Sequence, residues 1–235
     1  MTYNESLKCF QQSRWESLSV EEKAEAMQAM ENEMALRSGR EPCKVHISRE
    51  WCDDDKLGVY DCESRTIQVN GWQLENLSLH GNEADSHLET ILHEGRHAYQ
   101  YDAVTGKIDH PDKQEVEVWT ENMKEENCVQ PGPGNEDAYN NQPIERDAND
   151  FAQETMRQVK EEMKQANGES LDEGSGGGDF KSRWSCFTEK LGGLLGGGED
   201  NSHSRGNGEE AAGSEAHSQE TDGGHGQDEG QGMER

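Results

Sequence analysis

Hydrophobic residues in the N-terminal part of the chain recur at the three- and four-residue spacing of amphipathic helices. Ser19-Val20-Glu21-Glu22 has the capping-box pattern that begins a helix, and Gly39 stands where such a helix would end. The pattern predicts a helix over about 20–38, with a shorter helix before it. Leu7, Phe10 and Trp15 indicate the shorter helix. The longer one carries Ala24, Met27, Met30, Met34 and Leu36, and its Met and Leu side chains are expected in the core.

Between residues 41 and 73 the spacing changes, and hydrophobic and polar residues alternate as they do in half-buried strands. The alternating runs are 44–48, 57–62 and 66–70, and Glu63-Ser64-Arg65 makes a tight connection between the last two. We therefore predict a small three-stranded sheet, either a meander or a mixed sheet. His46 alternates with hydrophobic neighbours and is expected to face solvent.

Helical spacing returns after this region and continues almost to Gly168. One helix is expected over about 82–101, with Leu88, Ile91, Leu92 and Tyr99 as its apolar stripe, and a second between 112 and 126. A Pro-Gly-Pro-Gly loop then precedes a long helix that begins at Pro143. The apolar stripe of this last helix comprises Ile144, Ala148, Phe151, Ala152, Met156, Val159 and Met163.

The composition changes after residue 168, and this change sets the limit of the expected folded part. Only 29% of the 235 residues are hydrophobic, and the segment after 168 is dominated by Gly, Glu, Asp, Ser, Gln and His. Such a segment cannot bury enough apolar surface to offset its chain entropy. We predict one folded domain at 1–167 and a disordered acidic tail at 168–235. The tail contains an aromatic and leucine-rich island at 180–195, which either folds against a partner, a membrane surface or the domain's own cleft, or is an isolated hydrophobic spot.

The net charge of -28 bears on the partners of the chain. Binding to nucleic acid is not expected, because no basic stripe is present to neutralise phosphates. The simplest role of this acidity is to keep the protein in solution, and a preference for basic substrates or partners is the alternative.

The sequence has no apolar run long enough to span a bilayer and no conventional signal peptide. Its six cysteines are scattered without a Cys-x-x-Cys pair, which argues against a thiolate zinc site or a redox motif. We therefore expect a cytoplasmic protein with reduced thiols. Export by an unconventional route and a disulfide between Cys52 and Cys62 are the alternatives.

The sequence His93-Glu94-Gly95-Arg96-His97 carries the candidate chemistry. On a helix, the two histidines four positions apart project from one face and can bind a single zinc ion, while Glu94 stands beside the metal as a general base. A pair of structural histidines is the alternative. Gly95 costs helix propensity, which predicts that something packs closely against it, most naturally a strand of the sheet.

A catalytic zinc ion generally takes three protein ligands and leaves one position for water, so a third ligand is needed. Glu145 is our choice, because it opens the last long helix, where Asn149 shares its face and could hydrogen-bond a ligand. Glu145 could instead merely favour the helix N-terminus through the helix dipole. The competing ligands are His110, Glu115, Glu117 and Asp102.

This set of residues predicts hydrolysis of an amide bond. Zinc lowers the pKa of its bound water towards about 7, Glu94 takes the proton, and the hydroxide attacks a carbonyl polarised by the metal. A donor for the developing oxyanion is also needed. Tyr139 ranks first because it precedes Glu145 in the sequence, and the other candidates are Tyr99, Tyr101 and His110.

The segments 92–97 and 144–152, Leu-His-Glu-Gly-Arg-His and Ile-Glu-Arg-Asp-Ala-Asn-Asp-Phe-Ala, resemble the compact gluzincin-like metallopeptidases of the ImmA/IrrE type. Those proteins have His-Glu-x-x-His on one helix and Glu-x-x-Ala-Asn-x-Phe-Ala on the next, and the similarity covers roughly 41–157. It implies an α+β minimal zincin-like domain in which His93, His97 and Glu145 bind zinc and Glu94 is the catalytic base. Gly95-Arg96 replaces the usual apolar–Gly pair, and no helix-turn-helix segment is present.

From the sequence we thus expect a zinc metallopeptidase that acts on a peptide or protein substrate. One alternative is a non-enzymatic binding or regulatory protein that retains the fold and perhaps the metal. Another is a phage-associated or secreted effector that uses the same site. Substitution of Glu94 by Gln separates the enzyme from the binding protein, because only the enzyme depends on a general base at this position.

Overall fold

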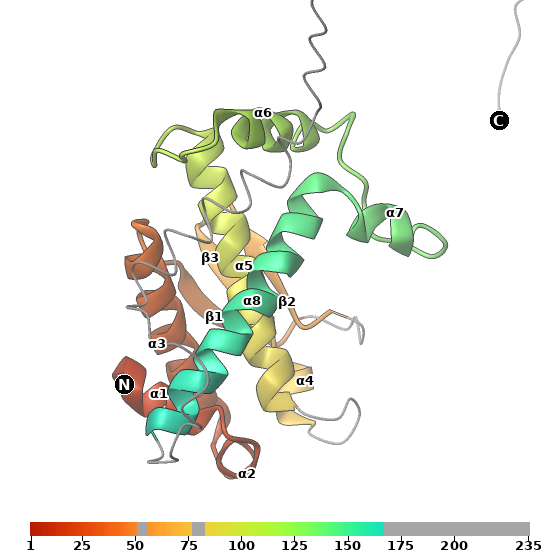
Figure 1. Ribbon diagram of the computed structural model, residues 1–235. Coiled ribbons are helices and arrows are strands. Elements are labelled where there is room, and N and C mark those ends of the chain that lie inside the picture. Colours follow the sequence, from red (N-terminus) through yellow and green to blue (C-terminus); the bar gives the residue numbers. More distant parts are fainter. Residues whose placement is uncertain (51–55, 77–82, 167–235) are drawn as a thin grey trace, which may run out of the picture. The chain divides into compact units, whose positions relative to one another are not determined.

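Helices pack against one small sheet in the computed structural model of the chain, which describes residues 1–50, 56–76 and 83–166 (Figure 1). The helices are α1 (Tyr3–Cys9), α2 (Gln12–Trp15), α3 (Val20–Ser38), α4 (Gly71–Glu75), α5 (Glu83–Val104), α6 (Lys113–Asn122), α7 (Glu136–Asn140) and α8 (Pro143–Ala166). The strands are β1 (Lys44–Ser48), β2 (Gly58–Asp61) and β3 (Thr66–Asn70). Within the described residues the fold is therefore mixed, with eight helices and a three-stranded sheet, and this confirms the predicted combination of helices and a small sheet.

The long N-terminal helix has the ends that the sequence predicts. The hydroxyl of Ser19 accepts a hydrogen bond from the backbone of Glu22, whose side chain accepts one from the backbone of Ser19. The helix ends at Gly39, which adopts the left-handed conformation with φ of +69°. The shorter helix expected before it is in fact two helices, α1 and α2.

Most of the predicted core positions of this helix are buried, and one is not. Met27, Met30 and Met34 are buried, whereas Leu36 is 75% exposed, so the prediction that Leu36 contacts the core is wrong. Leu36 follows Met34 by two positions, and on a helix this spacing places a side chain on nearly the opposite face.

The sheet is mixed rather than a meander, with strand order β1-β3-β2. The central strand β3 pairs with β1 in parallel and with β2 in antiparallel orientation, and its Ile67 and Val69 are fully buried. His46 of β1 is exposed, as predicted. β2 lies at an edge of the sheet, beside α5.

The helix α5 is the centre of the described fold, because it contacts α3, α6, α8 and the strands β2 and β3. In Figure 1, α8 lies across α5, and the two helices pack against each other. α8 begins at Pro143, as predicted. The hydrophobic pattern did not predict α4 and α7, since helices of five residues are too short to show a helical period.

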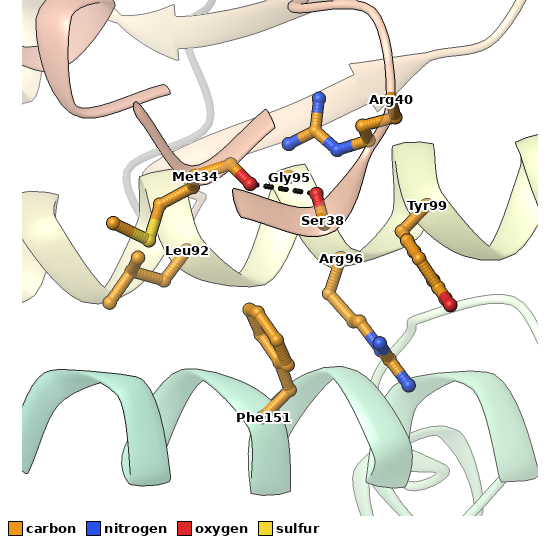
Figure 2. A pocket seen from close by; sticks show the side chains of 8 residues that line it. All are labelled: Met34, Ser38, Arg40, Leu92, Gly95, Arg96, Tyr99 and Phe151. Atoms are coloured by element: carbon orange, nitrogen blue, oxygen red, sulfur yellow. Dashed lines mark hydrogen bonds between the residues drawn. The ribbon is translucent and has the colours of Figure 1, made fainter. Parts of the chain in front are cut away.

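The close contact expected at Gly95 exists, but it is not made by a strand. A Cβ atom at Gly95 would lie 2.8 Å from Arg40 Nη2 and 3.0 Å from Glu31 Oε2, two side chains that form a buried ion pair. The missing side chain therefore makes room for an ion pair of the α3 region. Figure 2 shows the small pocket that Arg40 and Gly95 line together with Phe151 of α8.

Some predictions fall on residues that the structure does not describe. The predicted acidic tail at 168–235 and its island at 180–195 lie outside the described residues, as does Cys52, while Cys62 is a free thiol. Within the described ranges, no helix is both long enough and apolar enough to cross a membrane.

Candidate metal centre

Two histidines of α5 and one glutamate of α8 bring their side-chain ligand atoms together. His93 and His97 lie about one turn apart on α5, so their imidazoles share a face, and Glu145 lies in the first turn of α8. The two histidine Nε2 atoms are 3.0 Å apart. Glu145 places Oε2 at 3.2 Å from His93 Nε2 and Oε1 at 3.5 Å from His97 Nε2. The packing of α8 along α5 thus unites residues that are distant in the sequence.

This donor set and its spacing fit a metal ion. The ligand atoms of His93, His97 and Glu145 all lie within 4.8 Å of one another. Around a tetrahedral zinc ion with bonds of about 2.0–2.1 Å, neighbouring ligand atoms are about 3.4 Å apart, close to the distances found here. Two imidazoles and one carboxylate also leave one tetrahedral position for water, which is the arrangement of catalytic rather than structural zinc sites.

Charges within the centre shift two of its pKa values in opposite directions. Burial lowers the pKa of His97, but the hydrogen bond to Glu145 and the negative charges of Glu94 and Glu145 outweigh this effect and raise it to about 9. Burial tends to raise the pKa of Glu145, yet hydrogen bonds from His93 and His97 hold that pKa well below its usual range. The carboxylate of Glu145 therefore requires a positive partner, either a protonated histidine or a metal ion.

Glu94 lies between the two histidines in the sequence and is held by the sheet. It is 8% exposed, and its Oε2 accepts a hydrogen bond of 2.8 Å from the backbone amide of Tyr60 in β2. In an antiparallel pair, successive residues direct their backbone groups alternately towards the partner strand and away from it. The Leu57 carbonyl accepts from the Asn70 amide, so Tyr60, three residues later, directs its amide away from β3. The edge strand thus fixes the carboxylate of Glu94 without using a pairing bond of the sheet.

The close approach of β2 to α5 depends on a glycine. A Cβ atom at Gly58 would overlap the Cγ2 of Thr90 and would lie 3.3 Å from the Gln68 carbonyl oxygen and 3.5 Å from Glu94 Cγ. A larger residue fits only if the Thr90 side chain or the strand moves. Gly58 therefore permits the contact between Tyr60 and Glu94.

Tyr139 of α7 also reaches this centre. Burial raises its pKa, and the negative charge of Glu145, the hydrogen bond to Glu145 and the charge of Glu94 raise it further. The hydroxyl group therefore stays protonated and can donate a hydrogen bond at neutral pH. The structure thus brings together all five residues that the sequence predicted for the site: His93, Glu94, His97, Tyr139 and Glu145.

The competing ligands have other partners or positions. Asp102 forms two hydrogen bonds, of 2.7 and 2.6 Å, with Arg65. His110 is buried between Glu115 (2.8 Å) and the Tyr99 hydroxyl (2.9 Å). These contacts also occupy two of the alternative oxyanion donors, Tyr99 and His110. The remaining candidates are the exposed Glu117 on α6 and Tyr101, whose ring meets that of Tyr60 at 6.4 Å.

The sequence prediction missed three contributors to the centre. Gln100 contacts His97 through a hydrogen bond of 2.8 Å, in the supporting role that we had expected of Asn149. Its position three residues after His97, on the same helix face, was a signal that could have revealed it. Tyr60 contributes a backbone amide and Gly58 a missing side chain, and neither has a sequence signal of its own.

Comparisons of the chain with protein-family models, with curated proteins and with solved structures find no match. A function is therefore inferred from the arrangement of the side chains in this centre.

Proposed function

We propose that the chain is a zinc-dependent metallopeptidase, a hydrolase that cleaves peptide bonds in a peptide or protein substrate. The observation that carries this proposal is the convergence of His93, His97 and Glu145 beside a glutamate that is not needed as a ligand. The two histidines and Glu145 would hold the zinc ion. Glu94, fixed by the Tyr60 amide, would be the general base.

The mechanism assigns a separate role to each remaining residue. When bound, zinc supplies the positive charge that makes a water molecule acidic and polarises a substrate carbonyl. Glu94 accepts the proton of the attacking water and later returns it to the leaving amine. Tyr139, with its raised pKa, donates a hydrogen bond to the negative charge that develops on the carbonyl oxygen.

The edge of the sheet supports a peptide as the substrate. β2 is an edge strand beside α5, and in its register with β3 the backbone groups of Gly58 point away from the sheet. An extended peptide can pair with such an edge through its backbone. A peptide bound there would run past Glu94, which contacts the same strand.

The order of the elements also supports the minimal zincin-like domain that the resemblance implies. A small sheet precedes the helix with the two histidines, and the helix with Glu145 follows it and packs against it. Gly95 and Arg96, the two residues that differ from the family's usual pair, each have a contact in the fold. Gly95 leaves room for Arg40, and Arg96 pairs with Asp147 of α8.

Substitution of Glu94 by Gln tests the proposal. The full chain is loaded with zinc and incubated with a randomised fluorogenic peptide library. Wild type should cleave the library, and Glu94→Gln should lose about 10²- to 10⁴-fold in rate, the usual effect of removing a general base, while it keeps its zinc. Glu117→Gln, an exposed glutamate on α6, is the matched control and should retain full activity.

Two results would contradict the peptidase. One is equal cleavage by wild type and the Glu94→Gln chain, which would place the base elsewhere. The other is stoichiometric zinc in a wild-type chain that cleaves no peptide of the library, which would favour the non-enzymatic metal-binding alternative.

A further inference from the structure

Gln100 joins the candidate ligand His97 to the interface between α5 and α8. Its side chain is fully buried, and its Oε1 lies 2.8 Å from His97 Nδ1. Its Nε2 lies 2.9 Å from the carbonyl oxygen of Ile144 and 2.6 Å from Asp147 Oδ2. One amide group therefore contacts a candidate metal ligand at one end and two groups of α8 at the other.

The chemistry of these neighbours fixes which way the amide of Gln100 faces. The Ile144 carbonyl can only accept a hydrogen bond, and so can an ionised Asp147 carboxylate. Asp147 forms a two-pronged ion pair with Arg96, whose Nε and Nη2 atoms lie 2.8 and 2.9 Å from its two oxygens. Two acceptors at one end require the NH₂ group there, so the oxygen of the Gln100 amide must face His97.

Arg96 is held by its ion pair with Asp147 and by three aromatic rings. It is 2% exposed, and its guanidinium lies 4.5 Å from the ring centre of Tyr99, 5.3 Å from that of Trp119 and 4.9 Å from that of Phe151. An arginine side chain stays charged at all accessible pH values. The ion pair therefore holds the Asp147 carboxylate in place as an acceptor for Gln100 on the α8 side.

An acceptor oxygen opposite His97 Nδ1 determines the state of that ring. Nδ1 must carry the hydrogen, and in the neutral imidazole Nε2 is then the nitrogen with the free lone pair. His97 Nε2 is the atom that lies near His93 and Glu145. The chain of contacts from Arg96 through Asp147 and Gln100 thus directs the lone pair of His97 to the point where the three ligands converge.

We propose that Gln100 is a positioning residue that selects the metal-binding tautomer of His97, and that the buried Arg96–Asp147 ion pair sets the orientation of Gln100. This inference rests on the metal centre of the proposed function but not on peptidase activity. It gives a second role to an ion pair that would otherwise only join two helices. Supporting hydrogen bonds of this kind typically contribute about 10- to 100-fold to metal affinity.

The test measures zinc affinity of the full chain by competition with a chromogenic chelator. Gln100→Met removes both ends of the amide while keeping its length and should weaken zinc binding about 10- to 100-fold. Gln158→Met, at a buried glutamine of α8 whose amide donates to Glu154, is the matched control and should bind zinc as wild type does. Unchanged affinity in Gln100→Met overturns the proposal.

The similar volume of methionine separates positioning from packing. Because Gln100→Met leaves the space filled, a loss of zinc affinity in this variant reports the lost hydrogen bonds rather than a cavity. Nitrogen-15 spectra of the zinc-loaded wild type should show hydrogen on Nδ1 of His97, and hydrogen on Nε2 would overturn the tautomer assignment. A wild type without zinc overturns the metal centre, whereas zinc binding unaffected by Gln100→Met overturns only the role of Gln100.

Discussion

Two histidines of the same helix occupy environments with opposite effects. His87 and His97 both lie on α5, with 1% of His87 and 15% of the His97 side chain exposed. Burial lowers the pKa of His87 to about 4; the hydrogen bond to the Glu83 carbonyl opposes this effect, and the charge of Lys23 adds to it. The pKa of His97 instead rises to about 9, because the hydrogen bond to Glu145 and the charges of Glu94 and Glu145 outweigh burial.

The difference shows what turns a buried histidine into a candidate metal ligand. His87 packs at 5.6 Å from the ring of Trp15 and has a backbone carbonyl as its hydrogen-bond partner. His97 meets a carboxylate from another helix and an amide that fixes its tautomer. Both histidines belong to the same helix, so the decisive contribution is the set of polar groups that α8 supplies.

The largest expected effect comes from removing a ligand. Glu145→Gln should lower zinc affinity by on the order of a thousandfold, because the site loses one of three protein ligands and its negative charge. His87→Gln should leave zinc affinity unchanged. Metal content of the purified chain and a chelator competition titration measure both variants. Full affinity in the Glu145→Gln chain would show that the third ligand is another residue.

The contrast between local and distant contacts also explains how much the sequence could predict. The capping box at Ser19 and the start at Pro143 were predicted correctly because the signals for helix ends lie within one turn. The shared face of His93 and His97 follows from helical geometry alone. These features needed no knowledge of what packs against the helices.

Predictions that depended on tertiary packing were less successful. A strand was expected against Gly95, but the ion pair of Arg40 and Glu31 lies there. The strand β2 instead approaches α5 at Thr90, through its own Gly58. The Tyr60 amide that holds Glu94 belongs to the backbone, which has no pattern of its own in the sequence. Selecting Glu145 among five acidic or histidine candidates relied on the resemblance and on its position in the last helix.

Acid should destabilise the zinc-free chain through His87. Its folded-state pKa of about 4 lies below its ordinary value of 6.5, so the unfolded state binds the proton first as the pH falls between these values. Stability should drop by roughly 3 kcal/mol over this window, and His87→Met should remove that part of the loss. Urea unfolding at about pH 7 and pH 4 measures the difference. The exposed His46→Met chain is the control, and an equal acid loss in His87→Met would contradict the assignment.

Zinc affinity should keep rising with pH to a higher value than it would for a histidine whose pKa is lowered by burial. His97 has a raised pKa, so in the zinc-free chain its contribution to stability is full below 6.5 and is lost as the pH rises through about 9. Zinc must displace the same proton, so its apparent affinity should increase up to about tenfold per pH unit below that value. His87→Met should show the same slope, and a flat profile in wild type would contradict a protonated His97.

The smallest expected effect concerns Gly58, which lies against Thr90 and Glu94 of α5 and not against His87. Gly58→Ala should push β2 away from Thr90 and draw the Tyr60 amide away from Glu94, since a Cβ atom there has no room. A misplacement of about 1 Å in a catalytic group can cost up to a hundredfold, so we expect peptide hydrolysis to fall about tenfold. Zinc affinity should be unchanged, because the strand touches the base and not the ligands, and the loss of stability in acid due to His87 should also persist.

Gly132→Ala, where the nearest atom would be 3.6 Å away, is the matched control. If zinc affinity falls together with hydrolysis, then β2 supports the ligands as well as the base, and the separation between them proposed here is wrong.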